Sequence, residues 1–431
     1  MLWGITSFFN PAGYQRPVQN LEVFAARVRA QGLPLMIVEL ALEGAEFIID
    51  ESLCDQLVRV RSDQVLWHKE ALLNIGLRHL PAACDTVAWL DSDVLFENQQ
   101  WVADTRLALE QHRVVQPFSH CIWLPPDVES VDLSLTTYPS HAKEYGRIHS
   151  FGFGWQHFGP HALEARVLYG HVGFAWAARR ATLDEIGGFY DASILGSGDS
   201  LMAHGFVGPE VMLRNEGPRI APALLAHYGE WAEKATAAVQ GDVGYVDGNL
   251  NHLWHGQMSN RGYIDRNATL LNAGYDPKLH LMRDENGLYG LHNAPPLLDA
   301  AVRQHFVDRK EDLLPERAPV CKFGEGFHND EGKFRWARRR ASARVLRNAP
   351  DWSLTVSNNA PHRFASPQRI TAFLNGKEVA KAELPDSNKV EMLIGEVRPG
   401  DQLELHAEHV FSPSSFGGAD KRELSFMVWN T

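Results

Sequence analysis

The sequence predicts an α/β domain built on a mostly parallel sheet, followed by a small all-β sandwich. Strand-like and helix-like segments alternate from the first residues to about residue 117, which is typical of a parallel sheet with right-handed crossovers. After residue 350 the chain instead shows short alternating strands separated by Asn-Gly and Pro-Gly turns. We therefore expect an α/β domain over residues 1–300, a helical linker over 301–349 and a β-sandwich over 350–431.

Each element of the α/β pattern has its own signal. Apolar, β-prone runs predict strands, and apolar residues at helical spacing predict helices. In chain order we expect a strand over 2–8, a helix around 21–28, a strand over 35–39, a helix over 65–79, a strand over 86–90, a helix over 99–111 and a strand over 114–117. Ligands of such sheets bind at the carboxyl ends of the strands, so the residues that follow these strands are candidates for a site.

Two carboxylates follow the third predicted strand. The apolar run Thr86-Val-Ala-Trp-Leu90 stops at Asp91-Ser-Asp93. Because alternate residues of an extended chain lie on the same side, Asp91 and Asp93 are expected to face one point in space. Two hard oxygen donors at the end of a strand suit a divalent cation that holds a diphosphate. The spacing therefore predicts a site for an activated, phosphate-bearing molecule.

Composition and charge are those of an ordinary enzyme. The 431 residues exceed one compact core of typical size, and 45% of them are hydrophobic. A formal net charge of −12 disfavours nucleic acid and anionic membranes as partners. Scattered cysteines, the lack of a long uncharged apolar stretch and a start without a basic segment predict a cytoplasmic protein with no integral membrane segment.

The rest of the chain falls into three patterns. Residues 120–300 are rich in Gly, His and aromatic residues with weak periodicity, which favours binding loops. The arginine-rich stretch 333–347 is expected to form a solvated linker helix. Within the β-sandwich we expect strands over 353–357, 369–374, 390–394 and 402–407.

Three motifs together resemble the nucleotide-sugar half of GT-A glycosyltransferases. The first is Trp89-Leu-Asp91-Ser-Asp93, preceded by Asn74-Ile-Gly-Leu77. The second is Gly187-Gly-Phe-Tyr-Asp191 followed by Gly196-Ser-Gly-Asp199, and the third is Leu253-Trp-His255-Gly256. The resemblance implies a Rossmann-like GT-A domain that transfers a sugar from a nucleoside-diphosphate donor to an acceptor hydroxyl.

The resemblance also implies roles for single residues. By analogy Asp91, Asp93 and His255 would bind Mn²⁺ or Mg²⁺, and Asp199 would be the general base that deprotonates the acceptor. Many inverting members carry an adjacent Glu-Asp pair where this chain has Gly198 and Asp199, so only one carboxylate is available there. The structural alternative for Asp199 is a helix N-cap.

Further residues are expected to contact the donor. Thr6 and Glu39 end the first two strands, where the family places nucleoside contacts, and an arginine after His255 would clamp diphosphate oxygens. The candidate donor-binding residues are Thr6, Glu39, Lys69, Asp91, Ser92, Arg261 and Tyr263. The alternative for Thr6 and Glu39 is that they are simply hydrated in loops. The alternative for Lys69 is a solvated lysine on the helix surface. The acceptor stays open among a glycan, a protein, a small molecule and a modified nucleobase.

Two other functions fit the same sequence. Leu90-Asp-Ser-Asp-Val94 also satisfies the Asp-x-Asp-x-Val signature of haloacid-dehalogenase-like phosphatases, in which Asp91 would be the nucleophile. Two βα units precede it here, whereas that motif usually opens the phosphatase fold. The other function is a non-catalytic carbohydrate-binding protein on a transferase scaffold, because segments 373–377 and 411–424 resemble small jelly-roll modules attached to glycan-assembly enzymes.

Overall fold

The chain divides into two compact units. The computed structural model describes residues 1–124, 126, 147–164, 170–210, 217–262, 265–313, 320–328, 334–358, 366–416 and 420–429. The first unit comprises the described parts of Met1–Trp123 and Arg147–Leu313, and the second those of Leu124–Gly146 and Leu314–Thr431. Within these residues, no helix is long and apolar enough to span a membrane.

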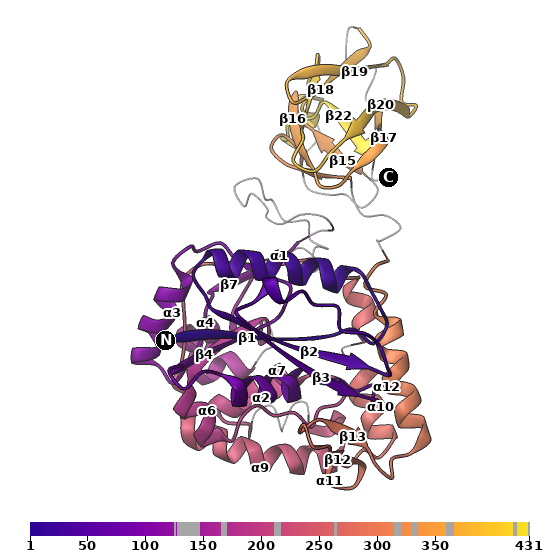
Figure 1. Ribbon diagram of the computed structural model, residues 1–431. Helices are drawn as coiled ribbons and strands as arrows, with labels where there is room; N and C mark the ends of the chain where they lie inside the picture. The colour runs from indigo at the N-terminus through magenta and orange to yellow at the C-terminus, as the bar shows by residue number, and fades with distance from the viewer. Residues whose placement is uncertain are drawn as a thin grey trace. The chain divides into compact units, whose positions relative to one another are not determined.

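A seven-stranded sheet lies at the centre of the first unit, as far as the chain is described (Figure 1). Its strands are β1 (Leu2–Phe9), β2 (Leu35–Leu42), β3 (Gln56–Ser62), β4 (Thr86–Leu90), β6 (Val114–Gln116), β9 (Ala175–Arg179) and β10 (Val243–Tyr245). They follow the order β10-β6-β9-β4-β1-β2-β3, and all neighbours are parallel except the two pairs made by β9. The predicted mostly parallel sheet is therefore confirmed.

Helices cover both faces of this sheet. The described helices of the first unit are α1 (Arg16–Ala30), α2 (Lys69–His79), α3 (Trp101–Gln111), α4 (Phe151–Phe158), α6 (Arg180–Ile186), α7 (Gly198–Val207), α9 (Pro222–Val239), α10 (Asp265–Asn272), α11 (Pro277–His280) and α12 (Pro296–Asp308). Of these, α1, α2, α3, α4 and α6 pack against strands of the sheet. Figure 1 shows α1 and α2 on opposite faces. β2 is buried along its whole length because Leu35 and Ile37 pack with α1, whereas Met36 and Val38 pack with α2.

A smaller sheet extends from the end of β4. It contains β5 (Val94–Phe96), β11 (Asn249–His252), β7 (His120–Trp123) and β8 (Arg147–His149), in that order. β5 and β11 run antiparallel, with His252 opposite Val94. A hairpin of β12 (Leu281–Arg283) and β13 (Tyr289–Leu291) completes the described strands of this unit. The pairing of β5 with β11 brings the late part of the first unit next to the Asp pair.

The Asn-Ile-Gly-Leu motif on α2 has a structural explanation. The Asn74 side chain accepts from the Phe189 N–H at 2.8 Å and donates to the Phe189 carbonyl at 2.9 Å, which fixes the Gly-Gly-Phe-Tyr-Asp turn against the helix. Gly76 lets α2 approach the sheet, because a Cβ there would lie 2.7 Å from Ile5 Cγ2 and 3.0 Å from Val38 Cγ2. The helix itself begins at Lys69, later than the predicted residue 65.

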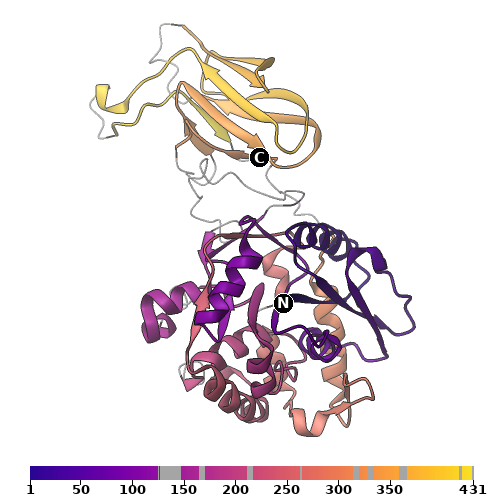
Figure 2. The same cartoon turned by 60° about the vertical axis from the view of Figure 1, so that its left-hand side comes forward.

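Two antiparallel sheets make up the described strands of the second unit (Figure 2). One contains β14 (Cys321–Phe323), β16 (Arg340–Val345), β21 (Gln402–Ala407), β18 (Gln368–Leu374) and β19 (Lys377–Leu384), and the other β15 (Phe334–Ala337), β22 (Phe426–Trp429), β17 (Ala349–Ser357) and β20 (Val390–Val397). Side chains from both sheets share one hydrophobic cluster. All four predicted strands lie within these elements, and Asn375-Gly376, with φ of 51° and 79°, makes the turn from β18 to β19.

The predicted linker helix over 333–347 is wrong. The described part of this stretch forms the strands β15 and β16 instead. In β16 the burial alternates, so that Ala341, Ala343 and Val345 point into the core while Arg340 is exposed. Small apolar residues at every second position, separated by polar ones, fit a strand with one buried face, which a helix of the same sequence would not provide.

Candidate functional site

The Asp pair lies where the two sheets of the first unit meet. β4 ends at Leu90, β5 begins at Val94, and Asp91-Ser-Asp93 forms the link. Two backbone hydrogen bonds fix this link: the Asp91 N–H donates to the Phe174 carbonyl at 2.7 Å, and the Leu253 N–H donates to the Asp93 carbonyl at 2.7 Å. Three stretches that are far apart in the sequence therefore meet at the Asp pair.

Asp93 shares a buried cluster with two histidines. Its Oδ2 lies 2.9 Å from His255 Nε2 and 3.6 Å from His252 Nε2, and the two imidazole nitrogens are 3.2 Å apart. Among the described residues, these three form a group whose ligand atoms all lie within 4.8 Å of one another. The structure thus brings Asp93 and His255 together as expected, and adds His252, which the sequence analysis missed.

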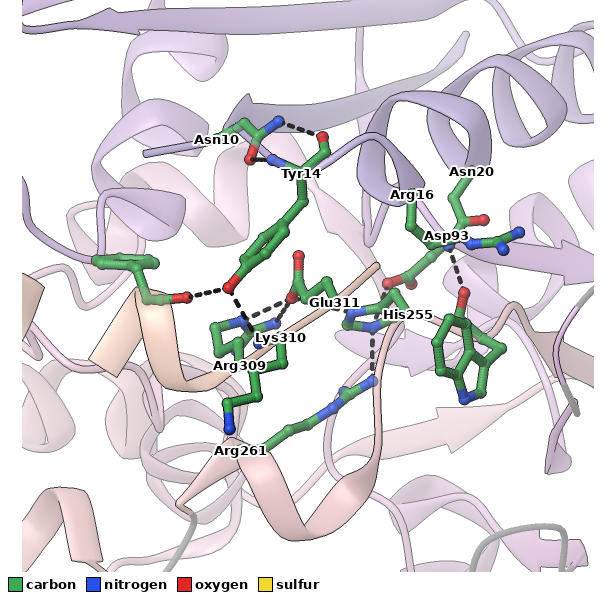
Figure 3. Close-up of polar contacts among 12 residues, drawn as sticks. Asn10, Tyr14, Arg16, Asn20, Asp93, His255, Arg261, Arg309, Lys310 and Glu311 are labelled. Carbon is green, nitrogen blue, oxygen red and sulfur yellow. Dashed lines mark hydrogen bonds and ion pairs between the residues drawn. The ribbon is translucent and has the colours of Figure 1, made fainter. Parts of the chain in front are cut away.

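The tautomer of His255 and an unpartnered oxygen of Asp93 favour a cation in this cluster. The Nδ1 of His255 lies 3.1 Å from Glu311 Oε1 (Figure 3), so Nδ1 carries the ring proton and Nε2 presents a lone pair. Burial lowers the pKa of His252 to about 4, so its ring is neutral at pH 7. The Oδ1 of Asp93 is buried and has no hydrogen-bond partner in the described part of the chain. A cation held by Asp93, His252 and His255 would satisfy the Asp93 carboxylate, and it would replace the Arg261 N–H that His255 Nε2 accepts in this structure.

This donor set fits a divalent transition metal. Mg²⁺ prefers oxygen ligands, whereas a set of two imidazoles and one carboxylate suits a divalent first-row transition metal. Glu311 accepts the Nδ1 proton of His255, an arrangement that commonly fixes a metal-binding histidine. Burial would raise the pKa of Glu311, but Arg309 and His255 hold it at about 2, so this carboxylate is charged.

A second cluster joins Asp91 to Asp199 through Lys69. The Lys69 Nζ lies 2.5 Å from Asp91 Oδ1 and 3.0 Å from Asp199 Oδ2. Burial alone would lower the pKa of Lys69, but Asp199 and Asp91 hold it well above its ordinary value, so the ammonium stays charged. Lys69 is buried, and the alternative of a solvated lysine is wrong. Metal binding by Asp91 stays a prediction, because its carboxylate contacts Lys69 in this structure.

Asp199 lies in the first turn of α7, next to a carboxyl group from α2. Ser197 occupies the N-cap position, so the N-cap alternative for Asp199 is wrong. A Cβ on Gly198 would lie 2.2 Å from the Oε1 of Glu70, so glycine at this position makes room for that side chain. Burial raises the pKa of Glu70 to about 8. The sequence analysis found one carboxylate here, and the structure places a second beside it.

The structure places the next four residues predicted to contact the donor at different locations. Arg261 is buried, and its Nη2 donates to His255 Nε2 at 2.7 Å, so it lies at the metal-ligand cluster. Thr6 is fully buried in β1, and its hydroxyl has no hydrogen-bond partner among the described residues. Ser92 is half-buried between the two aspartates. Tyr263 lies outside the described residues. Their contacts with a donor stay predictions.

Glu39 is engaged within the protein. Its Oε1 accepts from the N–H groups of Ile48 and Ile49 at 2.6 and 3.1 Å, and its Oε2 lies 3.4 Å from the Arg59 Nε. Buried carboxylates with several donors usually hold loops in place. The expected nucleoside contact of Glu39 stays a prediction, and it would add to a structural role that these contacts already define.

Aromatic rings surround His252. Phe174 stacks on His171 and on His252, with ring centres 3.8 and 4.6 Å away, and Trp123 meets both histidines edge-on at 5.1 and 6.4 Å. Phe174 has a φ of 77°, a strained conformation for a residue other than glycine. Its carbonyl accepts the Asp91 N–H, so the strained backbone lies beside the Asp pair while the ring stacks on His252.

Comparisons with known proteins do not assign the chain to a family. No family model and no curated protein matches it. Glucosyl-3-phosphoglycerate synthase from Mycobacterium tuberculosis, in complex with Mn²⁺, UDP and phosphoglyceric acid, is 13% identical, with a TM-score of 0.30 over 70% of this chain and 91% of that chain. The TarS 1–349 structure from S. aureus is 10% identical, with a TM-score of 0.29 over 72% of this chain and 71% of that chain.

A third match involves a different class of protein. A family two carbohydrate esterase from Clostridium thermocellum, in complex with cellohexaose, is 10% identical, with a TM-score of 0.18 over 26% of this chain. The chain spans 30% of the length of that esterase. TM-scores of 0.30 or below leave the function to be inferred from the site itself.

Proposed function

We propose that the chain is a metal-dependent glycosyltransferase of the GT-A type, which moves a sugar from a nucleoside-diphosphate donor to an acceptor hydroxyl. The observation that carries this proposal is the convergence of Asp93, His252 and His255 on one point, linked through the Asp pair to the cluster of Lys69 and Asp199. One cluster suits a divalent cation, and the other supplies a buried ammonium group and a carboxylate. Both lie at the carboxyl end of β4, where ligands of parallel sheets bind.

The metal-ligand cluster meets the needs of the leaving group. When the bond between the anomeric carbon and the diphosphate oxygen breaks, its electron pair stays with the diphosphate. A divalent metal held by Asp93, His252 and His255 would stabilise that charge as a Lewis acid. Arg261 brings a buried guanidinium to the same place, and its planar fork suits bidentate contact with phosphate oxygens.

The cluster around Lys69 meets the needs of the acceptor. As the acceptor oxygen bonds to the anomeric carbon, its hydroxyl proton must pass to a base, and Asp199 is the carboxylate proposed to take it. Lys69 donates to both Asp199 oxygens, at 3.1 and 3.0 Å, and so holds the carboxylate in one orientation. Asp91 contacts the same ammonium group, which links the proposed base to the Asp pair.

The direct test is turnover of a panel of nucleotide sugars. With Mn²⁺, the wild-type protein is expected to release nucleoside diphosphate from at least one of them, and EDTA is expected to stop the reaction. Asp199→Asn removes the proton acceptor but keeps the size of the side chain, so kcat is expected to fall about 10²–10⁴-fold. Donor binding, measured by calorimetry, is expected to persist in this variant.

Two results would replace the proposal. Covalent phosphorylation of Asp91 by a generic phosphoester would favour the phosphatase. Binding of glycans without turnover of any nucleotide sugar would favour the non-catalytic carbohydrate-binding protein.

A further inference from the structure

A short charged segment follows α12 and reaches the metal-ligand cluster. It consists of residues 309–312, Arg-Lys-Glu-Asp, and is called the 309–312 segment below. It lies at the end of the first unit, more than fifty residues beyond His255 in the chain. None of the motifs in the sequence points to it.

Glu311 of this segment is placed to orient His255. Its Oε1 accepts from His255 Nδ1 at 3.1 Å and from Arg309 Nε at 2.6 Å (Figure 3). The side chains of Arg309 and Glu311 are only 12% and 9% exposed. A buried carboxylate that accepts the Nδ1 proton keeps the tautomer whose Nε2 can bind a metal, and it stops the ring from turning away.

The N-terminal part of the chain holds the segment in place. Asp312 accepts from the two backbone N–H groups at the start of α1, at 2.9 and 2.7 Å, and so caps that helix from a distant part of the chain. The Tyr14 hydroxyl donates to the Val307 carbonyl at 2.7 Å. It accepts from the Lys310 N–H at 3.1 Å (Figure 3). Glu311 is therefore fixed from both sides.

A glycine makes the close approach to His255 possible. Gly256 has a φ of 92°, and a Cβ there would lie 2.9 Å from the Arg309 carbonyl oxygen and 3.1 Å from the Glu311 Cα. A side chain at this position would push the segment away from His255. Gly262 also has a positive φ, of 55°, but a Cβ there would meet nothing within 4 Å among the described residues.

From these contacts we infer that Glu311 is a positioning residue of the metal site, which sets the affinity for the metal by fixing His255. It acts through the histidine and does not itself join the ligand group. The inference rests on the proposed function in one respect, since it takes His255 to be a metal ligand. It adds that the 309–312 segment, and the start of α1 that holds it, determine how well the cation is bound.

Binding of Mn²⁺ to the metal-free full-length chain, without any donor, tests this role. Glu311→Ala is expected to weaken Mn²⁺ binding about 10–100-fold, as measured by electron paramagnetic resonance of the free ion. Glu311→Gln keeps an oxygen that accepts the Nδ1 proton, so it is expected to bind more tightly than Glu311→Ala. Asp93→Ala removes a proposed ligand, so its residual Mn²⁺ affinity is the reference for loss of the site. Melting curves without metal check that each variant is folded.

A pair of glycine variants tests the position of the segment without changing any polar group. Gly256→Ala and Gly262→Ala both place alanine at a positive φ, but 55° lies in the left-handed region that alanine can adopt and 92° does not, so melting curves without metal measure the backbone cost of each variant. Only Gly256→Ala forces the 309–312 segment away from His255. It is expected to weaken Mn²⁺ binding several-fold, whereas Gly262→Ala is expected to bind as the wild type does.

The outcomes separate this inference from the proposed function. If wild-type protein binds Mn²⁺ and turns over a donor, but Glu311→Ala binds the ion equally well, the positioning role is overturned and the transferase stands. If the wild-type protein binds no Mn²⁺, the metal site itself is overturned, and the role of Glu311 falls with it.

Discussion

Among single residues, Glu70 is expected to make the stability of the protein depend on pH. Its side chain is buried beneath Gly198, and burial raises its pKa from 4.5 to about 8. The folded state therefore favours the protonated acid. The stability that protonated Glu70 contributes to the folded state is fully present below about pH 4.5 and is lost as the pH rises through about 8.

Glu70→Gln should remove this dependence, because the amide stays neutral at every pH. Between pH 5 and 8.5 the free energy of unfolding of the wild type is expected to fall relative to that of the variant, by something on the order of 4 kcal/mol. Urea unfolding at the two pH values measures the difference. Glu185→Gln, at an exposed position on α6, is the control and should follow the wild type. Parallel pH profiles for Glu70→Gln and the wild type would show that Glu70 is charged in the folded protein.

Residues that carry a local sequence signal were predictable. Asp91 and Asp93 follow from alternation at the end of a strand, and His255 stands in a motif. His252 becomes a neighbour of Asp93 only through the pairing of β11 with β5, which no local pattern reveals in a chain with 20 histidines. Glu311 depends in the same way on the path of the chain after α12.

At the scale of elements, one glycine sets how closely α2 packs on the sheet. A Cβ at Gly76 would meet Ile5 and Val38 at 2.7 and 3.0 Å. Gly229 in the middle of α9 is the natural comparison, since a Cβ there would meet nothing within 4 Å in the described structure. Both glycines therefore lie within an α-helix, but only Gly76 is packed closely against its neighbours.

Replacing each with alanine should have opposite effects. Gly76→Ala is expected to destabilise the protein by about 1–3 kcal/mol through overpacking. Gly229→Ala is expected to stabilise it by about 0.5–1 kcal/mol through helix propensity. Urea unfolding of the two variants, side by side, measures both. Stabilisation by Gly76→Ala would mean that α2 can move away from the sheet without cost.

Strands and helices could be predicted wherever the apolar residues follow one clear period. The strands of the second unit show clean alternation, and their positions follow from the sequence. The stretch 333–347 has many arginines, which suit a solvated helix as well as an exposed strand face. This stretch forms strands because β16 pairs with β21 and β14. Such pairing between distant parts of the chain cannot be read from the number of arginines.

At the scale of the whole molecule, the candidate site lies within the first unit. The metal-ligand cluster, the Lys69 cluster and the 309–312 segment all belong to it. The parallel order of the sheet follows from alternating strands and helices, but two features do not. The antiparallel β9 between β4 and β6, and the smaller sheet that begins at β5, depend on the pairing of strands from residues 120–300 with the earlier strands β4, β5 and β6.

The central claim is that Asp93, His252 and His255 hold a divalent cation. Crystals grown with Mn²⁺ and a nucleoside diphosphate, with diffraction recorded at the manganese absorption edge, would locate that ion anywhere in the molecule. The account predicts one strong anomalous peak within about 2.0–2.4 Å of Asp93 Oδ2 and of the Nε2 atoms of His252 and His255, with diphosphate oxygens on its open side. An ion bound elsewhere, with Asp93 and His252 still contacting His255 as they do in the metal-free protein, would contradict it.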